Sequence, residues 1–131
     1  MALPTLPPLP TLLPTIISTI LITASIPLIH HPVEFSKNYI HIDNPQSVFF
    51  VRQLGTRNLM IGVAIGALVY RGEIASVATV LCCFPLLGIL DPVAGWCYRG
   101  RFVKNDYNHF ILGCLFGGIG WWILGLEEGR V

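Results

Sequence analysis

Apolar residues along this chain fall into four long runs, with most of the polar residues gathered between them. The runs cover residues 12–29, 48–70, 74–96 and 109–126. A helix that crosses the hydrocarbon core of a bilayer needs about 20 residues, so the second and third runs are long enough and the other two lie at the lower limit. None of the runs alternates between apolar and polar positions as barrel strands do. The pattern predicts one domain over residues 1–131, an all-α four-helix transmembrane bundle.

Prolines are expected to shape the first and third helices. A proline-rich tail over residues 1–14 precedes the main part of the first run. Pro27 and Pro32 should end the first helix, and Pro85 should kink the third, because proline lacks the N–H group that a helix interior needs. The first run follows no basic residue and precedes no small-residue cleavage pattern, so we expect a retained span rather than a signal peptide.

Small residues recur at helical spacing and predict faces on which helices approach one another closely. The rows are Gly55, Gly62 and Gly66; Gly113, Gly117 and Gly120; Ala75, Thr79 and Cys83; and Thr15, Thr19 and Thr23. Because several helices carry such a row, we expect packing within one chain, with a face for a second copy as the alternative. The three tryptophans, at 96, 121 and 122, are expected to anchor at the membrane interfaces.

The composition supports a membrane protein. Hydrophobic residues make up 53% of the chain and charged residues 11%, whereas soluble domains carry roughly 25% charged residues. The net charge is +1 with acids and bases mixed, so the chain offers no basic field for nucleic acid. Its four cysteines have no metal-ligand spacing, and no cofactor-binding motif is visible. We therefore expect no nucleic-acid partner, no metal and no cofactor.

The distribution of charge predicts an orientation. Four spans would place both termini and the turn at 71–73 on one side of the membrane, and the loops 30–46 and 97–108 on the other. The second set of loops holds most of the basic residues outside the runs: Lys37, Arg99, Arg101 and Lys104. Basic loops face the cytosol, so we expect a multi-pass protein of the endoplasmic reticulum with lumenal or exterior termini.

Arg57 stands where the hydrocarbon region of the second helix should begin. Counted from Val51, it lies roughly 9 Å along the helix axis at 1.5 Å per residue. An arginine at such a depth is normally turned toward the bundle interior and paired. Asp91 is the only acid inside an apolar run, and antiparallel second and third helices would bring it to the same side of the membrane. The sequence predicts an Arg57–Asp91 pair, which either belongs to a functional site or locks the bundle.

Other ionisable residues are expected at the same leaflet. His109 opens the fourth run, and Glu34 follows the first run together with His30 and His31. We take Asp91, Arg57, His109 and Glu34 as candidate catalytic residues, and Arg52, Gln53 and Asn58 as candidate substrate-binding residues.

Each of the histidines also has a simpler interpretation. His109 could be an interfacial residue that begins a helix, with the "ND" pair at 105–106 as its cap. His30 and His31 are of a kind that commonly faces lipid head groups. The histidines show neither an HxxxH nor an HExxH spacing, so the sequence does not favour a metal site.

The residue types suggest acid–base chemistry. Arg57 would stabilise developing negative charge, Asp91 would act as a general base on water or as a nucleophile, and His109 would carry a proton. Glu34 or Asp106 would supply a further acid. A site at the leaflet boundary admits a lipophilic substrate together with water, which suits hydrolysis, cyclisation or isomerisation. A membrane scaffold with a structural Arg57–Asp91 pair is the alternative, and a small transporter is a third.

The run "RQLGTRNLMIGV", with Asp91 late in the third span and His109 opening the fourth, resembles a family of small fungal-type four-helix integral membrane proteins that is filed as a domain of unknown function. The resemblance covers roughly residues 10–126, and its most specific part is R-x-x-G-x-R-N from Arg52 to Asn58. It implies an accessory member of polyketide or terpenoid biosynthesis, a membrane-bound tailoring enzyme of the epoxide hydrolase or cyclase type. A homo-oligomer or contacts with pathway enzymes would fit such a role.

Overall fold

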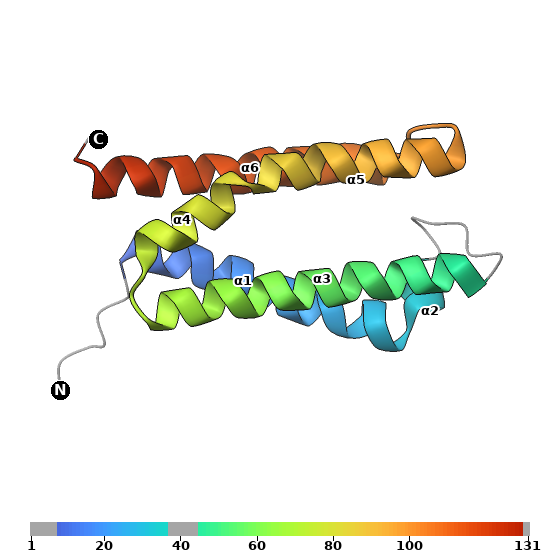
Figure 1. Cartoon of the computed structure of the whole chain (residues 1–131), viewed down its shortest axis with the longest axis horizontal. Coiled ribbons are helices and arrows are strands. Elements are labelled where there is room, and N and C mark those ends of the chain that lie inside the picture. Colours follow the sequence, from blue (N-terminus) through green and yellow to red (C-terminus); the bar gives the residue numbers. More distant parts are fainter. Residues whose placement is uncertain (1–7, 37–44, 130–131) are drawn as a thin grey trace. The chain divides into compact units, whose positions relative to one another are not determined.

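A computed structural model describes residues 8–36 and 45–129, apart from the side chain of Tyr98, and within these residues every regular element is a helix. In chain order the helices are α1 (Leu9–His30), α2 (Pro32–Ser36), α3 (Pro45–Tyr70), α4 (Ile74–Cys82), α5 (Phe84–Arg99) and α6 (Lys104–Glu127) (Figure 1). The predicted all-α class is confirmed for this part of the chain. Lys37 and the first seven residues of the proline-rich tail lie outside the described residues.

The chain divides into two compact units, Met1–Glu73 and Ile74–Val131. In the first unit α1 packs along α3, with the short α2 between them in sequence; in the second, α4 and α5 both pack against α6 (Figure 1). The units meet in sequence at a tight turn, where Arg71 Nε lies 3.0 Å from Glu73 Oε1. Gly72 between them has a φ of 73°, a conformation that glycine adopts at little cost.

The helices α1 and α3 approach closely at glycines. A Cβ atom placed on Gly55 would lie 2.8 Å from Leu28 Cβ, and one on Gly62 would lie 3.1 Å from the Ser18 carbonyl oxygen. The buried Ser18 hydroxyl donates a 2.8 Å hydrogen bond to the Gly62 carbonyl. The predicted glycine row of the second run is therefore confirmed as a contact within the chain.

The apolar stretch of α4 and α5 breaks at Cys83. Pro85 has no N–H group to donate to the carbonyl of Leu81, so a regular helix cannot continue through this point. The Cys83 N–H instead bonds the Val80 carbonyl at 3.1 Å, a tighter turn that ends α4. The predicted kink is confirmed, two residues before the proline itself.

The broken helix rests on the glycine row of α6. A Cβ atom on Gly117 would lie 2.7 Å from Pro85 Cδ, and one on Gly120 would lie 2.6 Å from the Ala78 carbonyl oxygen. Both contacts lie near the break, where a larger residue on α6 would push the two segments away. The second glycine row is thus also confirmed as a contact within the chain.

Two further rows that the sequence predicts as packing faces are exposed within their own units, so a contact of these rows with another helix stays a prediction. They are Thr15, Thr19 and Thr23 on α1, and Ala75, Thr79 and Cys83 on α4 and at its end. The threonine hydroxyls donate to carbonyls four residues earlier in their own helices, which satisfies them without a partner helix. Neighbouring faces are buried instead, with Ile17 and Ser18 on α1 and Val77, Ala78 and Leu81 on α4.

The first helix is longer than predicted at its start. It begins at Leu9, and Pro10 lies in its first turn, where the missing N–H would have had no partner in the helix. Pro27 does not end the helix as predicted but lies inside it. The helix ends at His30, directly before a bend and Pro32.

Three segments are long and apolar enough to cross a membrane: Leu9–His30, Ile74–Cys97 and Lys104–Glu127. These three segments indicate a membrane protein. The 26-residue α3 is not among these segments. Its first half contains Arg52, Gln53, Arg57 and Asn58, which lower its apolar character. The described residues thus support three of the four predicted spans.

Candidate functional site

The contact between α5 and α6 brings polar residues of the two helices together. The backbones are in close contact at Gly88 and Gly113, where a Cβ atom on Gly113 would lie 2.9 Å from Gly88 Cα. Asp91 follows Gly88 by three residues and His109 precedes Gly113 by four, so each lies one turn along its helix from the glycine contact. Because α5 and α6 run in opposite directions, Asp91 and His109 come to face one another.

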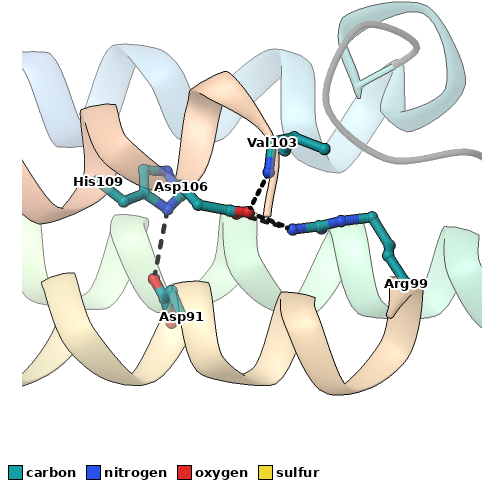
Figure 2. A network of polar contacts seen from close by, with 5 residues as sticks. All are labelled: Asp91, Arg99, Val103, Asp106 and His109. Atoms are coloured by element: carbon teal, nitrogen blue, oxygen red, sulfur yellow. Dashed lines mark hydrogen bonds and ion pairs between the residues drawn. The ribbon is translucent and has the colours of Figure 1, made fainter. Parts of the chain in front are cut away.

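Asp91 and His109 form a partly exposed polar contact in this unit. Asp91 Oδ2 lies 3.9 Å from His109 Nδ1, and the two side chains are 24% and 35% exposed. Figure 2 shows the carboxylate of Asp91 pointing from α5 toward the imidazole ring on α6. The distance allows ion pairing when the imidazole is protonated, whereas a direct hydrogen bond needs an approach of about 1 Å.

The helix is locally weakened beside Asp91. Pro92 follows it directly, inside α5, and has no N–H group for the Gly88 carbonyl four residues earlier. A Cβ atom placed on Gly88 would lie 3.0 Å from the His109 carbonyl oxygen, so the backbones of α5 and α6 are also in close contact here.

A second polar contact ties the end of α5 to the start of α6. Arg99 Nη2 donates hydrogen bonds of 2.8 and 2.7 Å to the two carboxylate oxygens of Asp106, and the Val103 N–H donates a 2.8 Å bond to Oδ2 (Figure 2). The Arg99 and Asp106 side chains are only 15% and 8% exposed. Asp106 lies in the first turn of α6, where a carboxylate also interacts favourably with the helix dipole. The pair therefore fixes the turn at residues 100–103.

The start of α6 differs from the predicted position. The helix begins at Lys104 rather than at 109, because Asp106 binds a backbone N–H group and Arg99 from within the first turn. His109 accordingly lies inside α6 rather than at its first position. The "ND" pair at 105–106 is part of the helix, so the interpretation of His109 as the first residue after a cap is wrong.

The two contacts are suited to different tasks. Asp106 accepts three hydrogen bonds and is buried, so its role is structural and it is not available as a further acid. Asp91 and His109 are partly exposed and lie farther apart. A carboxylate can accept a proton, and an imidazole can both accept and donate one near neutral pH, so this pair has the groups for general acid–base chemistry.

The other candidate residues lie in the first unit. Arg57 and Asn58 are half-buried on α3, while Arg52 and Gln53 are exposed on the same helix. Glu34 is exposed on α2. The Arg57–Asp91 pair and the roles of Glu34, Arg52, Gln53 and Asn58 stay predictions from the sequence. Of the candidate catalytic residues, the structure brings Asp91 and His109 together.

Sequence reasoning did not identify the Arg99–Asp106 pair. From the sequence, Arg99 was interpreted as a charged loop residue, and Asp106 as a helix cap or as a further catalytic acid. The signal that was available is the spacing: an arginine followed by glycine, and an aspartate seven residues later at the start of the next apolar run. Such spacing lets the two side chains meet across a short helix–helix turn.

Comparison with known proteins places the chain in a family. The family described as a domain of unknown function, DUF4267, matches residues 19–123, which include all seven candidate residues and the Arg99–Asp106 pair. No curated protein and no solved structure matches the chain. The match extends from within α1 to within α6. The chain therefore belongs to the DUF4267 family.

Proposed function

We propose that this protein is a membrane-embedded enzyme that uses Asp91 and His109 for acid–base chemistry on a lipophilic substrate. The observation that carries the proposal is the 3.9 Å separation of Asp91 Oδ2 and His109 Nδ1, with both side chains partly exposed. The two residues belong to segments apolar enough to span a membrane. Ionisable groups within such segments are costly and commonly functional.

A comparison of the Asp91–His109 pair with the Arg99–Asp106 pair supports this proposal. A pair whose task is to hold two helices together is expected to be buried and in direct hydrogen-bond contact, as Arg99 and Asp106 are at 2.7 Å. The Asp91–His109 pair has neither property. A longer distance in the absence of substrate is typical of catalytic hydrogen bonds, which tighten when the substrate is bound.

Opening of an epoxide illustrates the reaction that this pair would catalyse. The Asp91 carboxylate removes a proton from water, and the water oxygen attacks an epoxide carbon as the carbon–oxygen bond breaks. The protonated imidazole of His109 gives its proton to the departing oxygen, so water and epoxide yield a diol. Transfer of the proton from Asp91 to His109 restores the starting state. If a hydroxyl of the substrate takes the place of water, the product is a cyclic ether.

The resemblance supports a more specific proposal. We propose that the substrate is an intermediate of polyketide or terpenoid biosynthesis in a fungal type of pathway, and that the protein acts beside other enzymes of that pathway or as a homo-oligomer. We also propose that α3 is a fourth span, supported by the apolar second half of this 26-residue helix. An even number of spans would place both termini on one side of the membrane, and the basic residues in the loops of the other side would place the termini in the lumen of the endoplasmic reticulum.

A metabolite comparison tests the enzymatic proposal. Cells that lack the protein are complemented with wild type, Asp91→Asn, His109→Gln or the control Glu127→Gln, which changes an exposed acid at the far end of α6. Membrane levels are matched, and extracts are compared by LC–MS. Removal of a general acid or base typically costs a factor of about 10² to 10⁴ in rate, so both site variants should accumulate the precursor while Glu127→Gln converts it.

The masses in the extracts distinguish the reaction types, and the Asp91→Asn result distinguishes an enzyme from a scaffold. In a hydrolysis the product exceeds the precursor by one water, whereas cyclisation or isomerisation leaves the mass unchanged. If Asp91→Asn at matched levels restores the wild-type profile, the catalytic proposal is wrong and a scaffold role is favoured. The same assay with Arg57→Gln and Glu34→Gln tests the residues that were predicted from the sequence alone.

A further inference from the structure

The turn between α5 and α6 carries a cluster of three exposed aromatic rings. The Trp96 and Phe102 rings stack at a centroid distance of 6.1 Å and an interplanar angle of 9°, and Phe102 lies 6.5 Å from Tyr107. These side chains are 47%, 50% and 62% exposed. We call Trp96, Phe102 and Tyr107 the aromatic cluster. Rings of this kind gather at the interface between the apolar and polar regions of a bilayer.

The same turn carries positive charge. Arg101 and Lys104 are exposed and lie in sequence between Trp96 and Tyr107. The only carboxylate in the segment 98–108 is that of Asp106, which is buried and neutralised by Arg99. The turn therefore presents two exposed cations, and residues 98–108 contain no exposed acid. An anionic surface would be attracted to this end of the hairpin.

The opposite end of α6 has the reverse character. Glu127 and Glu128 are exposed there, after the exposed Trp121. The segments on both sides of the aromatic cluster, Ile74–Cys97 and Lys104–Glu127, are each apolar enough to span a membrane. Aromatic rings thus occur at both ends of α6, and among the described residues of this hairpin, 74–129, the exposed lysine and arginine side chains lie at the turn between α5 and α6.

We propose that the aromatic cluster, with Arg101 and Lys104, docks into the head-group region of a leaflet that contains anionic phospholipid. The rings would occupy the level between head groups and chains, and the two cations would bind the phosphate and carboxylate groups of the lipid. This proposal does not rest on catalysis by Asp91. It explains why ring stacking, exposure and positive charge coincide at one helix–helix turn.

The docking also fixes the depth of the candidate site. Asp91 precedes Trp96 by five residues in α5, a distance of about 7.5 Å along the helix at 1.5 Å per residue. With Trp96 at the head-group boundary, Asp91 and its partner His109 lie just inside the hydrocarbon region. A substrate dissolved in the lipid would reach them there, while water is still near.

Lipid-selective quenching of tryptophan fluorescence tests the proposal on the full chain in nanodiscs. The variant Trp121→Phe/Trp122→Phe keeps Trp96 as the sole tryptophan, and Trp96→Phe/Trp122→Phe keeps Trp121 as the matched control at the acidic end. Each is reconstituted with brominated phosphatidylserine or brominated phosphatidylcholine in an unbrominated phosphatidylcholine background. A cation near the surface contributes up to roughly a fivefold enrichment of anionic lipid, so phosphatidylserine should be enriched several-fold at Trp96 but not at Trp121.

Two further measurements complete the test. Arg101→Gln/Lys104→Gln in the sole-Trp96 background should abolish the enrichment, with unchanged helical circular dichroism because both side chains are exposed. Phosphatidylcholine brominated near the head group should quench Trp96 more than the same lipid brominated near the chain end. The proposal fails if the two lipids quench Trp96 equally, if Trp121 shows the same preference, if the charge-neutral variant retains it, or if the deep bromines quench Trp96 more strongly.

Discussion

A single methyl group added at Gly113 should separate α5 from α6. A Cβ atom at this position would lie 2.9 Å from Gly88 Cα and 2.9 Å from the Phe84 carbonyl oxygen. Both neighbours belong to the backbone, so no side-chain rotation can relieve the contact. An ordinary contact begins at 3.4 Å, and Gly113→Ala therefore requires the backbones to move apart by about 0.5 Å (3.4 − 2.9).

The expected loss of stability follows from two opposing terms. Overpacking of a well-packed contact typically costs about 1–3 kcal/mol. Replacement of glycine by alanine inside a helix contributes roughly 1 kcal/mol in the opposite direction. Gly118→Ala is the matched control, because a Cβ there meets nothing within 4 Å and the position lies in the same helix. The helix term cancels between the variants, so Gly113→Ala should be less stable than Gly118→Ala by about 1–3 kcal/mol.

Reversible unfolding in mixed micelles, followed by circular dichroism, measures this difference. Titration with a denaturing detergent gives the free energy of unfolding for wild type and both variants under identical conditions. Equal stability of the two alanine variants, within about 0.5 kcal/mol, would show that the glycine contact does not set the distance between α5 and α6. The positions of Asp91 and His109 would then need another explanation.

Two further stability predictions use the same assay. Asp106→Ala removes three hydrogen bonds and leaves Arg99 without its carboxylate, so it should lower the free energy of unfolding by about 3 kcal/mol. The double variant Arg99→Leu/Asp106→Leu should recover much of this loss. An unchanged free energy of unfolding in Asp106→Ala would refute the structural role. Ser18→Ala removes the buried bond to the Gly62 carbonyl and should cost about 1 kcal/mol. Thr19→Ala, at an exposed neighbouring position, is its control; the prediction is wrong if the two variants are equally stable.

The sequence predicts well those features that depend on local spacing. Glycines at intervals of three, four or seven residues predict close helix contacts, and Gly55, Gly62, Gly113 and Gly117 make them. The threonine row follows the same rule but is exposed within its unit, where each hydroxyl bonds a carbonyl of its own helix. Spacing alone does not distinguish a small residue that packs from one that is satisfied by its own backbone.

Features that depend on the pairing of charges were harder to predict. Asp91 and His109 meet because α5 and α6 are antiparallel and joined by a short turn, and the sequence had placed both at the same leaflet. The Arg99–Asp106 pair was missed because each residue had a satisfactory local explanation, one as a loop charge and the other as a helix cap. The helix start at Lys104 followed from that pair, so it was missed as well.

The short connection between Arg99 and Asp106 has a consequence for biosynthesis. The two residues are seven positions apart, so they leave the ribosome almost together and can neutralise one another as α6 enters the bilayer. A charge without a partner costs about 2.5–3.5 kcal/mol at the centre of a helix, and it costs less at this turn, which lies at the head-group level in the proposal above. Both members of the ion pair belong to the same α5–α6 hairpin, so insertion of the hairpin does not depend on contacts with residues that were synthesised much earlier.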